Sequence, residues 1–266
     1  SKFIDFENQY GFDKYKFKIL YLNRNIRRKS PGDVAMAYKY FMDGLTEEQR
    51  KECVFIWHSA PSDDQGTDMR AVCKTLLPDY PVIFTHDKGG PMNDEQMNFL
   101  YNSCDIYINM ASNEGFGLGS CEAMSVGKPI IVNVTGGLQD QCGFKKDGKY
   151  LTADDYVELK SNHRGTYKEH GEWVKPIFPT NISLSGSPMT PYIFDDRCSS
   201  DDGAAAIRYW YDKGPEERER CGELGRQFVK GEGRMSATKL AESFHKAFDD
   251  VWENWKPKEK YTLEVV

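Results

Sequence analysis

The alternation of short apolar segments with helical segments over residues 16–134 constrains the fold of this chain most strongly. Apolar runs typical of buried strands occupy five segments: residues 16–22, 54–57, 81–85, 105–110 and 129–134. Between them, apolar residues spaced by three or four predict helices: residues 31–41, 69–77, 94–101 and 119–126. Strands separated by such helices pair in parallel, because each helix carries the chain back to the starting edge of the sheet. The pattern therefore predicts an α/β fold, a Rossmann-like and mainly parallel sheet with helices on both faces.

Residues 143–197 interrupt this alternation. The segment is rich in Lys, Gly, His, Tyr, Pro and Ser, and it shows no sustained hydrophobic period. Helical patterning then returns in three pieces: residues 204–211, 216–229 and 236–255. We therefore predict one domain built from residues 1–142 and 198–255, an insertion or long loop at 143–197, and a loose tail at 256–266.

Charge and composition disfavour several classes of function. With 35 Lys and Arg against 41 Asp and Glu, the net charge is −6, which disfavours a broad nucleic-acid-binding face. No run approaches the ~18 apolar residues of a transmembrane segment, and no signal peptide opens the chain. Seven cysteines form no C-x-x-C pair, which predicts free thiols in a reducing compartment and hence a cytoplasmic protein. The five histidines lack metal-ligand spacing, so a metal site has little support. We expect no cofactor.

Residues 111–140, ASNEGFGLGSCEAMSVGKPIIVNVTGGLQD, carry the densest chemical signal. Glu114 ends a strand-to-helix turn, and Glu122 follows inside the predicted helix. The intervening glycines allow a tight turn and close approach of a ligand, and the helix start presents free N–H groups to an anion. This combination suits a ligand with both hydroxyls and phosphates. The alternative is a glycine-rich turn with two solvated carboxylates. A dinucleotide-binding G-x-G-x-x-G fails here, because Ser120 replaces its third glycine.

These residues carry a family resemblance. The runs E-G-F-G-L from Glu114, E-A-M from Glu122 and G-K-P from Gly127, with the later Gly-Gly pair, resemble the signature of retaining GT-B glycosyltransferases of family four. Upstream, Arg24 and Lys29 have the spacing of the basic pair in the family's G-R-x-x-x-x-K-G segment. The resemblance covers most of the chain outside residues 143–197. It implies the C-terminal half of a GT-B fold, a domain whose enzyme transfers a sugar from a nucleotide-diphospho-sugar with retention of configuration.

The resemblance also implies a role for each matching residue. Arg24 and Lys29 would clamp the diphosphate and neutralise the leaving group, and Glu114 would bind hydroxyls of the donor sugar. These three are the expected catalytic residues. Glu122 would hold the ribose, backbone N–H groups of the glycine-rich turn would contact sugar and phosphates, and the end of the third strand would contact the base. The predicted donor-binding residues are Arg24, Lys29, Thr85, His86, Asp87, Glu114, Gly115, Phe116, Gly117, Leu118, Gly119 and Glu122.

The family's reaction is generally metal-independent, which agrees with the absence of an Asp-x-Asp pair from this sequence. Four positions depart from the family pattern. Asn23 and Ser30 replace the glycines that flank the basic pair, Gly119 stands where Pro, Thr or Val is commoner, and Asp140 replaces the usual Glu. None of these changes removes a required charge.

The length departs from the family as well. A complete GT-B enzyme joins an acceptor-binding domain to a donor-binding one, and this chain resembles the second alone. We therefore expect as partners a nucleotide-sugar donor, an acceptor glycan, lipid or protein, and an N-terminal acceptor domain on a missing segment or another chain. Two alternatives remain open: a non-catalytic sugar-nucleotide-binding module, and a nucleotide-sugar epimerase or phosphorylase.

The position of residues 143–197 gives a further expectation. The segment begins just after Gly136-Gly137, at the carboxyl end of a predicted strand, where open α/β sheets bind their ligands. We expect it to lie near the donor cleft and to contact the acceptor or a partner. The alternative is a surface excursion that covers a sheet edge or a helix.

Overall fold

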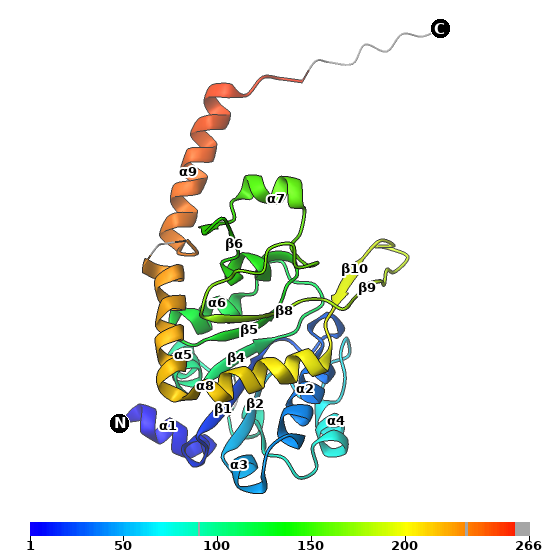
Figure 1. Ribbon diagram of the computed structural model, residues 1–266, viewed down its shortest axis with the longest axis vertical. Helices are drawn as coiled ribbons and strands as arrows, with labels where there is room; N and C mark the ends of the chain where they lie inside the picture. The colour runs from blue at the N-terminus through cyan, green and yellow to red at the C-terminus, as the bar shows by residue number, and fades with distance from the viewer. Residues whose placement is uncertain (90, 232–233, 259–266) are drawn as a thin grey trace. The chain divides into compact units, whose positions relative to one another are not determined.

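The computed structural model describes residues 1–89, 91–231 and 234–258 (Figure 1). The chain separates into two compact units, Ser1–Arg226 and Gln227–Val266, whereas the sequence placed the end of the domain at residue 255. Most of the predicted tail, residues 259–266, lies outside the described residues. Among the helices that the structure describes, none is both long and apolar enough to cross a membrane.

Six strands form the central sheet of the first unit, all parallel, in the order β3-β2-β1-β4-β5-β8. Their bounds are β1 Phe17–Leu22, β2 Cys53–His58, β3 Val82–Phe84, β4 Ile106–Asn109, β5 Ile130–Asn133 and β8 Val174–Ile177. The first five match the predicted strands to within one residue at each end, so the predicted parallel α/β sheet is confirmed. This is the 3-2-1-4-5-6 order of doubly wound folds, in which the direction of winding reverses between β1 and β4.

Helices cover both faces of this sheet (Figure 1). Those of the first unit are α1 Lys2–Tyr10, α2 Pro31–Asp43, α3 Glu47–Lys51, α4 Met69–Leu76, α5 Asp94–Ser103, α6 Leu118–Ser125, α7 Ala153–Leu159 and α8 Ser200–Arg226. Because strand side chains alternate between faces, one set (Phe17, Ile19 and Tyr21 in β1) packs in a core with α2, α4 and α8. The buried residues of α5 and α6 lie outside that core and cover the opposite face.

α8 contains the predicted helical piece 204–211 and most of the piece 216–229, whose last three residues fall in a π-helical turn. Gly214 interrupts it with non-helical dihedral angles (φ 73°, ψ 169°), and Pro215 follows, so the chain turns between two helical segments. The second unit consists of a short π-helical turn at Gln227–Gly231 and α9, Ala237–Asn254, as the pattern over residues 236–255 predicted. Among the described residues, 3-10 helical segments occupy Phe12–Lys14 (η1), Arg27–Lys29 (η2), Thr85–Asp87 (η3) and the longer Gly136–Cys142 (η4).

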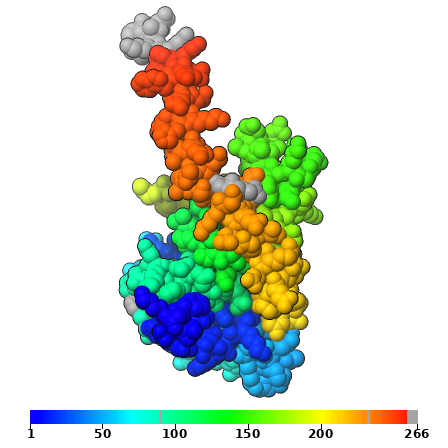
Figure 2. All heavy atoms as spheres, turned by 90° about the vertical axis from the view of Figure 1, so that its left-hand side faces the viewer, coloured from blue at the N-terminus to red at the C-terminus, as the bar shows by residue number. Residues whose placement is uncertain are grey.

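The N-terminal helix α1 was not predicted. The rings of Phe3 and Phe6 each lie 5.7 Å from the ring of Phe99 in α5. Figure 2 shows α1 in dark blue on the surface of the first unit, beside the teal atoms of α5. This aromatic contact attaches the helix to the outside of the α5 layer.

The expectation that residues 143–197 lie outside the Rossmann-like domain is wrong for β8, which pairs with β5 and completes the sheet. Its sequence, Val-Lys-Pro-Ile, lacks a continuous apolar run, and Pro176 argues against a central strand. β8 is an edge strand, where a proline is tolerated. The rest of the segment forms α7 and two small hairpins, from β6 Lys145–Lys146 with β7 Lys149–Tyr150, and from β9 Asn181–Leu184 with β10 Phe194–Arg197.

Substitutions in this segment separate the sheet strand from the surface elements. Ile177→Ala should lower the free energy of unfolding by about 2–4 kcal/mol, because it removes a buried side chain from the core. Val157→Ala, on exposed α7, should change it by less than about 0.5 kcal/mol. Urea denaturation of both variants measures the difference. Equal, small effects would contradict the inclusion of β8 in the core.

Ser30, which stands where the family pattern of the sequence analysis has glycine, has a backbone conformation that glycine adopts easily. It precedes α2 with φ 49° and ψ 45°, the left-handed region, and its side chain caps no helical N–H. Left-handed backbone costs an L-residue roughly 1–2 kcal/mol, and glycine avoids this cost. The departure from the family pattern therefore changes the residue at Ser30 and leaves a glycine-like backbone.

We accordingly expect Ser30→Gly to be more stable than Ser30→Ala by about 1 kcal/mol in urea denaturation. Lys74, on the exposed face of α4, provides the matched pair. There Gly should be less stable than Ala by a similar amount, since the helix has ordinary dihedral angles. If both positions rank glycine below alanine, the strain assigned to Ser30 is absent.

Candidate active site

The loops after β1 and β4 lie side by side, because these strands are neighbours where the sheet reverses its winding. The Ser112 N–H donates to the carbonyl of Arg28 at 2.8 Å and joins the two loops directly. Open α/β sheets bind ligands in the crevice at this point, outside the carboxyl ends of the strands. The fold therefore brings the predicted residues of both loops to one crevice.

Lys29 and Glu114 form a buried ion pair across this crevice. Lys29 Nζ contacts Glu114 Oε2, and each residue is only 8% exposed. Arg28 Nη1 lies 3.6 Å from the same oxygen and donates to the Asn113 carbonyl at 2.9 Å. Burial, with a smaller contribution from Arg28, lowers the pKa of Lys29 to about 8. Two cations thus flank one carboxylate, and the surplus positive charge suits an anionic ligand.

Helix α6 starts directly after this carboxylate. Gly117 is its N-cap, with φ 86°, and the first N–H groups of the helix, including those of Leu118 and Gly119, have no acceptor within it. The side chains of Phe116 and Leu118 are exposed. The helix start expected from the sequence is therefore present beside Glu114, and its contact with a phosphate stays a prediction.

Gly119 departs from the family pattern because Tyr107 fills the neighbouring space. A Cβ at Gly119 would lie 2.5 Å from the Tyr107 hydroxyl. That hydroxyl donates to the Leu22 carbonyl at 2.9 Å and accepts from Asn23 Nδ2 at 3.4 Å, so two of the departures meet in one contact.

The turn that carries Glu114 and Gly115 is held from η4. A Cβ at Gly137 would lie 2.1 Å from the Gly115 carbonyl oxygen, so the close approach of η4 requires glycine. This close approach lets the Gly137 N–H donate to the Glu114 carbonyl at 3.0 Å. The buried Gln141 side chain donates to the Phe116 carbonyl at 2.6 Å. These bonds explain why the Gly-Gly pair accompanies the Glu-Gly-Phe-Gly turn.

Glu122 lies on α6 with one carboxylate oxygen occupied. The Tyr101 hydroxyl donates to Glu122 Oε2 at 2.6 Å, and burial raises the pKa of Tyr101, so the hydroxyl keeps its proton. The other oxygen, Oε1, has no hydrogen-bond partner among the described residues. Glu122 is exposed, and one oxygen remains for a ligand hydroxyl.

Arg24 does not join the Lys29–Glu114 pair. Its Nε donates to Asp63 Oδ2 at 2.9 Å, in the loop after β2, and its side chain is 60% exposed. The expected pair of donor-clamping cations is thus separated in this structure, and Arg28 takes the place beside Glu114. Arg28 belongs to the same basic run of the sequence as Arg24 and Lys29. The run alone gave no reason to prefer Arg28 over Arg24 as the partner of Glu114.

The predicted base-binding turn forms η3 at the end of β3. Thr85 is buried and its hydroxyl lies 2.7 Å from His58 Nδ1, while Asp87 pairs with Arg70. Burial, with a contribution from His86, lowers the pKa of His58 to about 4, so His58 is neutral at pH 7. The Thr85 and Asp87 side chains are both engaged within the protein, and His86 is exposed.

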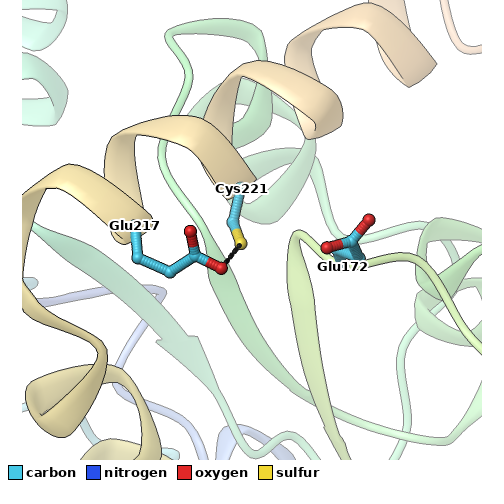
Figure 3. A group of neighbouring side chains, drawn as sticks. All are labelled: Glu172, Glu217 and Cys221. Atoms are coloured by element: carbon cyan, nitrogen blue, oxygen red, sulfur yellow. Dashed lines mark hydrogen bonds between the residues drawn. The ribbon is translucent and has the colours of Figure 1, made fainter.

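One cluster among the described residues has the side-chain types of a metal site (Figure 3): Glu172, Glu217 and Cys221, with ligand atoms within 4.8 Å of one another. Arg220 already pairs with both carboxylates, at 2.5 Å to Glu172 and 2.8 Å to Glu217. Burial raises the pKa of Cys221, away from the thiolate that binds metals. These residues are therefore a poor fit for a metal ion.

A pocket of about 760 Å³ lies at the amino ends of the strands. Its lining includes Asp105 and Pro129, which directly precede β4 and β5. Its arginines pair within the protein, Arg218 with Asp105 at 3.2 Å and Arg226 with Glu223 at 2.7 Å. The pocket is separate from the crevice that holds Lys29 and Glu114.

Two known proteins resemble part of this sequence. An uncharacterised glycosyltransferase of Methanocaldococcus jannaschii is 31% identical over 81 residues, which are 30% of this chain and 20% of that protein. A trehalose phosphorylase of Pleurotus sajor-caju is 26% identical over 123 residues, 45% of this chain and 16% of that protein. The matches thus cover a fifth or less of these relatives.

Solved structures share the fold over nearly the whole chain. HepE of Anabaena in complex with UDP-glucose superposes with a TM-score of 0.63 and 14% identity, over 94% of this chain and 53% of that one. Sucrose-phosphate synthase of Thermosynechococcus elongatus superposes with a TM-score of 0.60 and 17% identity, over 94% and 49%. The chain spans about half the length of these structures.

The family comparison agrees with the signature around Glu114. Residues 3–158, more than half of the chain, match the sequence profile described as glycosyl transferases group 1. The matched region contains β1 to β5 and every residue of the candidate site named in the sequence analysis. The chain therefore belongs to the group 1 glycosyl transferases.

Proposed function

We propose that this chain forms the nucleotide-sugar-binding part of a retaining glycosyltransferase. The observation that carries the proposal is the buried Lys29–Glu114 pair beside the start of α6. A cation and a helix start match a diphosphate, and a carboxylate matches sugar hydroxyls. The complex of HepE with UDP-glucose supports this class of donor.

The proposed roles follow from this arrangement. In sugar transfer the bond between the anomeric carbon and the diphosphate oxygen breaks, and negative charge grows on the leaving group. Lys29, with Arg28 beside it, would stabilise that charge, and Arg24 would join them after leaving Asp63. Glu114 would orient the sugar, and Glu122 would accept a hydrogen bond from the ribose. Retention of configuration rests on the family resemblance of these residues.

The length and the residues of the chain also support proposals for the acceptor domain, the absence of a metal and the cellular compartment. Since it spans half of the solved structures, we infer that an acceptor-binding domain on another segment or chain completes the enzyme. The basic side chains and the α6 start would bind the diphosphate without a metal or cofactor. All seven cysteines are free, which supports a reducing compartment, the cytoplasm.

A phosphorylase is the second candidate, because a trehalose phosphorylase matches 45% of the chain. In that case inorganic phosphate would take the place of the acceptor or of the nucleotide. Production of a sugar 1-phosphate from a disaccharide and phosphate, without a nucleotide sugar, would favour this candidate over the transferase.

The absence of a metal requirement can be tested by calorimetry with a panel of nucleoside diphosphates and their sugars. We expect binding to be unchanged when EDTA replaces magnesium. Because burial lowers the pKa of Lys29 to about 8, its positive charge is lost as the pH rises, and affinity should fall between pH 7 and 9. Lys29→Met should bind about 10–100-fold more weakly and lose this pH dependence. Binding that needs magnesium would overturn the proposed phosphate site.

Two carboxylate variants separate the proposed ribose and sugar roles. Glu122→Ala should weaken the nucleoside diphosphate and its sugar equally, by roughly 1–3 kcal/mol, since both contain the ribose. Glu114→Ala should weaken mainly the intact nucleotide sugar. The control is Glu219→Ala, in the pocket at the amino ends of the strands, which should leave the affinities for both ligands unchanged. Equal losses for both ligands in both variants would contradict the separate roles.

A further inference from the structure

The β9–β10 hairpin carries a buried carboxylate to the candidate active site. Asp195 lies in β10 and is 2% exposed. Its partners come from three directions. Oδ2 accepts from Arg27 Nη1 at 3.1 Å and from the Ser185 hydroxyl of the same hairpin. Oδ1 lies 3.1 Å from the Ser112 hydroxyl, which donates to it. Both oxygens are therefore occupied by protein groups.

Two of these partners belong to the loops that form the crevice. Arg27 is in η2, the same turn as Lys29, and Ser112 lies two residues before Glu114. The loops also meet directly, through the Ser112 N–H and the Arg28 carbonyl. Asp195 thus joins both loops from the side of the hairpin, 168 residues from Arg27 in the chain.

The neighbouring residue strengthens this attachment. Asp196 Oδ2 accepts from the Thr135 hydroxyl at 2.8 Å, and the Asp196 N–H donates to the Ser112 carbonyl at 2.8 Å. Asn133 Nδ2 donates to the Asp196 carbonyl at 2.6 Å. The hairpin is therefore bound to the ends of β4 and β5 as well as to η2.

Asp195 is buried, yet its partners keep it in the charged form. Burial alone would raise the pKa of Asp195, but hydrogen bonds from Ser185 and Ser112 and the Arg27 guanidinium keep it below its ordinary value. A buried carboxylate with such partners is ionised at neutral pH and restricts each of them to one geometry. Fixed loop geometry is what a site with a Lys–Glu pair needs in order to meet a ligand without rearrangement.

We propose that Asp195 is a positioning residue of the nucleotide-sugar site, which holds η2 and the Ser112–Glu114 loop in the register that pairs Lys29 with Glu114. The identity of the ligand in this inference rests on the proposed function. The effect of Asp195 on the two loops does not. Asp195 is 2% exposed and both of its oxygens bond to protein groups, so in this proposal it acts through Arg27 and Ser112.

The test replaces the charge without changing the shape of the side chain. In Asp195→Asn the amide oxygen can accept on one side only, and the Arg27 guanidinium loses its charged acceptor. We expect a roughly tenfold rise in the dissociation constant of the nucleotide sugar that wild-type protein binds most tightly. The matching nucleoside monophosphate, which lacks the second phosphate and the sugar assigned to Glu114, should bind within twofold of wild type.

The matched control is Asp33→Asn, which breaks an exposed pair with Arg197 at the far end of β10 and changes the charge equally. It should leave both affinities unchanged. If Asp195→Asn does not fold, Ser112→Ala removes one contact and keeps the carboxylate. The same loss for the nucleotide sugar, with unchanged monophosphate binding, is then expected. An unchanged affinity in the folded variant, or equal losses for both ligands, would overturn the positioning role.

Hydrogen exchange separates this inference from the proposed function. Without ligand, amides of residues 27–30 and 112–116 should exchange at least several-fold faster in Asp195→Asn than in wild type or Asp33→Asn. Faster exchange in a protein that binds no nucleotide would retain the structural effect and reject the proposed ligand. Unchanged exchange in both loops would reject the role of Asp195, whatever the protein binds.

Discussion

The parallel pairing of β1 with β4 determines where everything else in the candidate site can lie. The helices after these strands, α2 and α6, cover opposite faces of the sheet, so the two connecting loops diverge and leave a crevice between them. Lys29 enters the crevice from one loop and Glu114 from the other. Their contact, the start of α6 and the position of Glu122 all follow from that single neighbour relation.

The ion pair in the crevice is difficult to explain by stability alone. Removing two charges from water costs several kcal/mol per ion, and an apolar pair of similar volume often stabilises a fold equally well. Here the pair lies among polar loop atoms, with Arg28 adding a second cation. A ligand of the proposed kind, with phosphates for the cations and hydroxyls for the carboxylate, would use both charges.

Local patterns in the sequence were sufficient for the strands β1 to β5 and for the glycine-rich turn before α6. They failed for β8, because Lys175 and Pro176 hide a buried edge strand that only the partner strand β5 reveals. In the site, Glu114 and Glu122 were indicated by the glycine-rich run itself, whereas Lys29 and the role of each residue came from a family resemblance. The pairing of Arg24 with Asp63 and the contact of Asp195 with Arg27 depend on loops brought together by the fold, so no spacing along the chain could indicate them.

α8 also makes the order of synthesis matter. Its residues Ala204, Ile207 and Trp210 cover the apolar face built by β1 and α2, and the Ser200 hydroxyl bonds to the Asp33 carbonyl, 167 residues earlier. At roughly 5–20 residues per second, a ribosome needs on the order of ten seconds to supply that cover. Until then the nascent chain presents Phe17, Tyr38 and Phe41 to its surroundings, and such a chain is a natural substrate for a chaperone. Truncation before α8 would leave the same surface permanently open to aggregation.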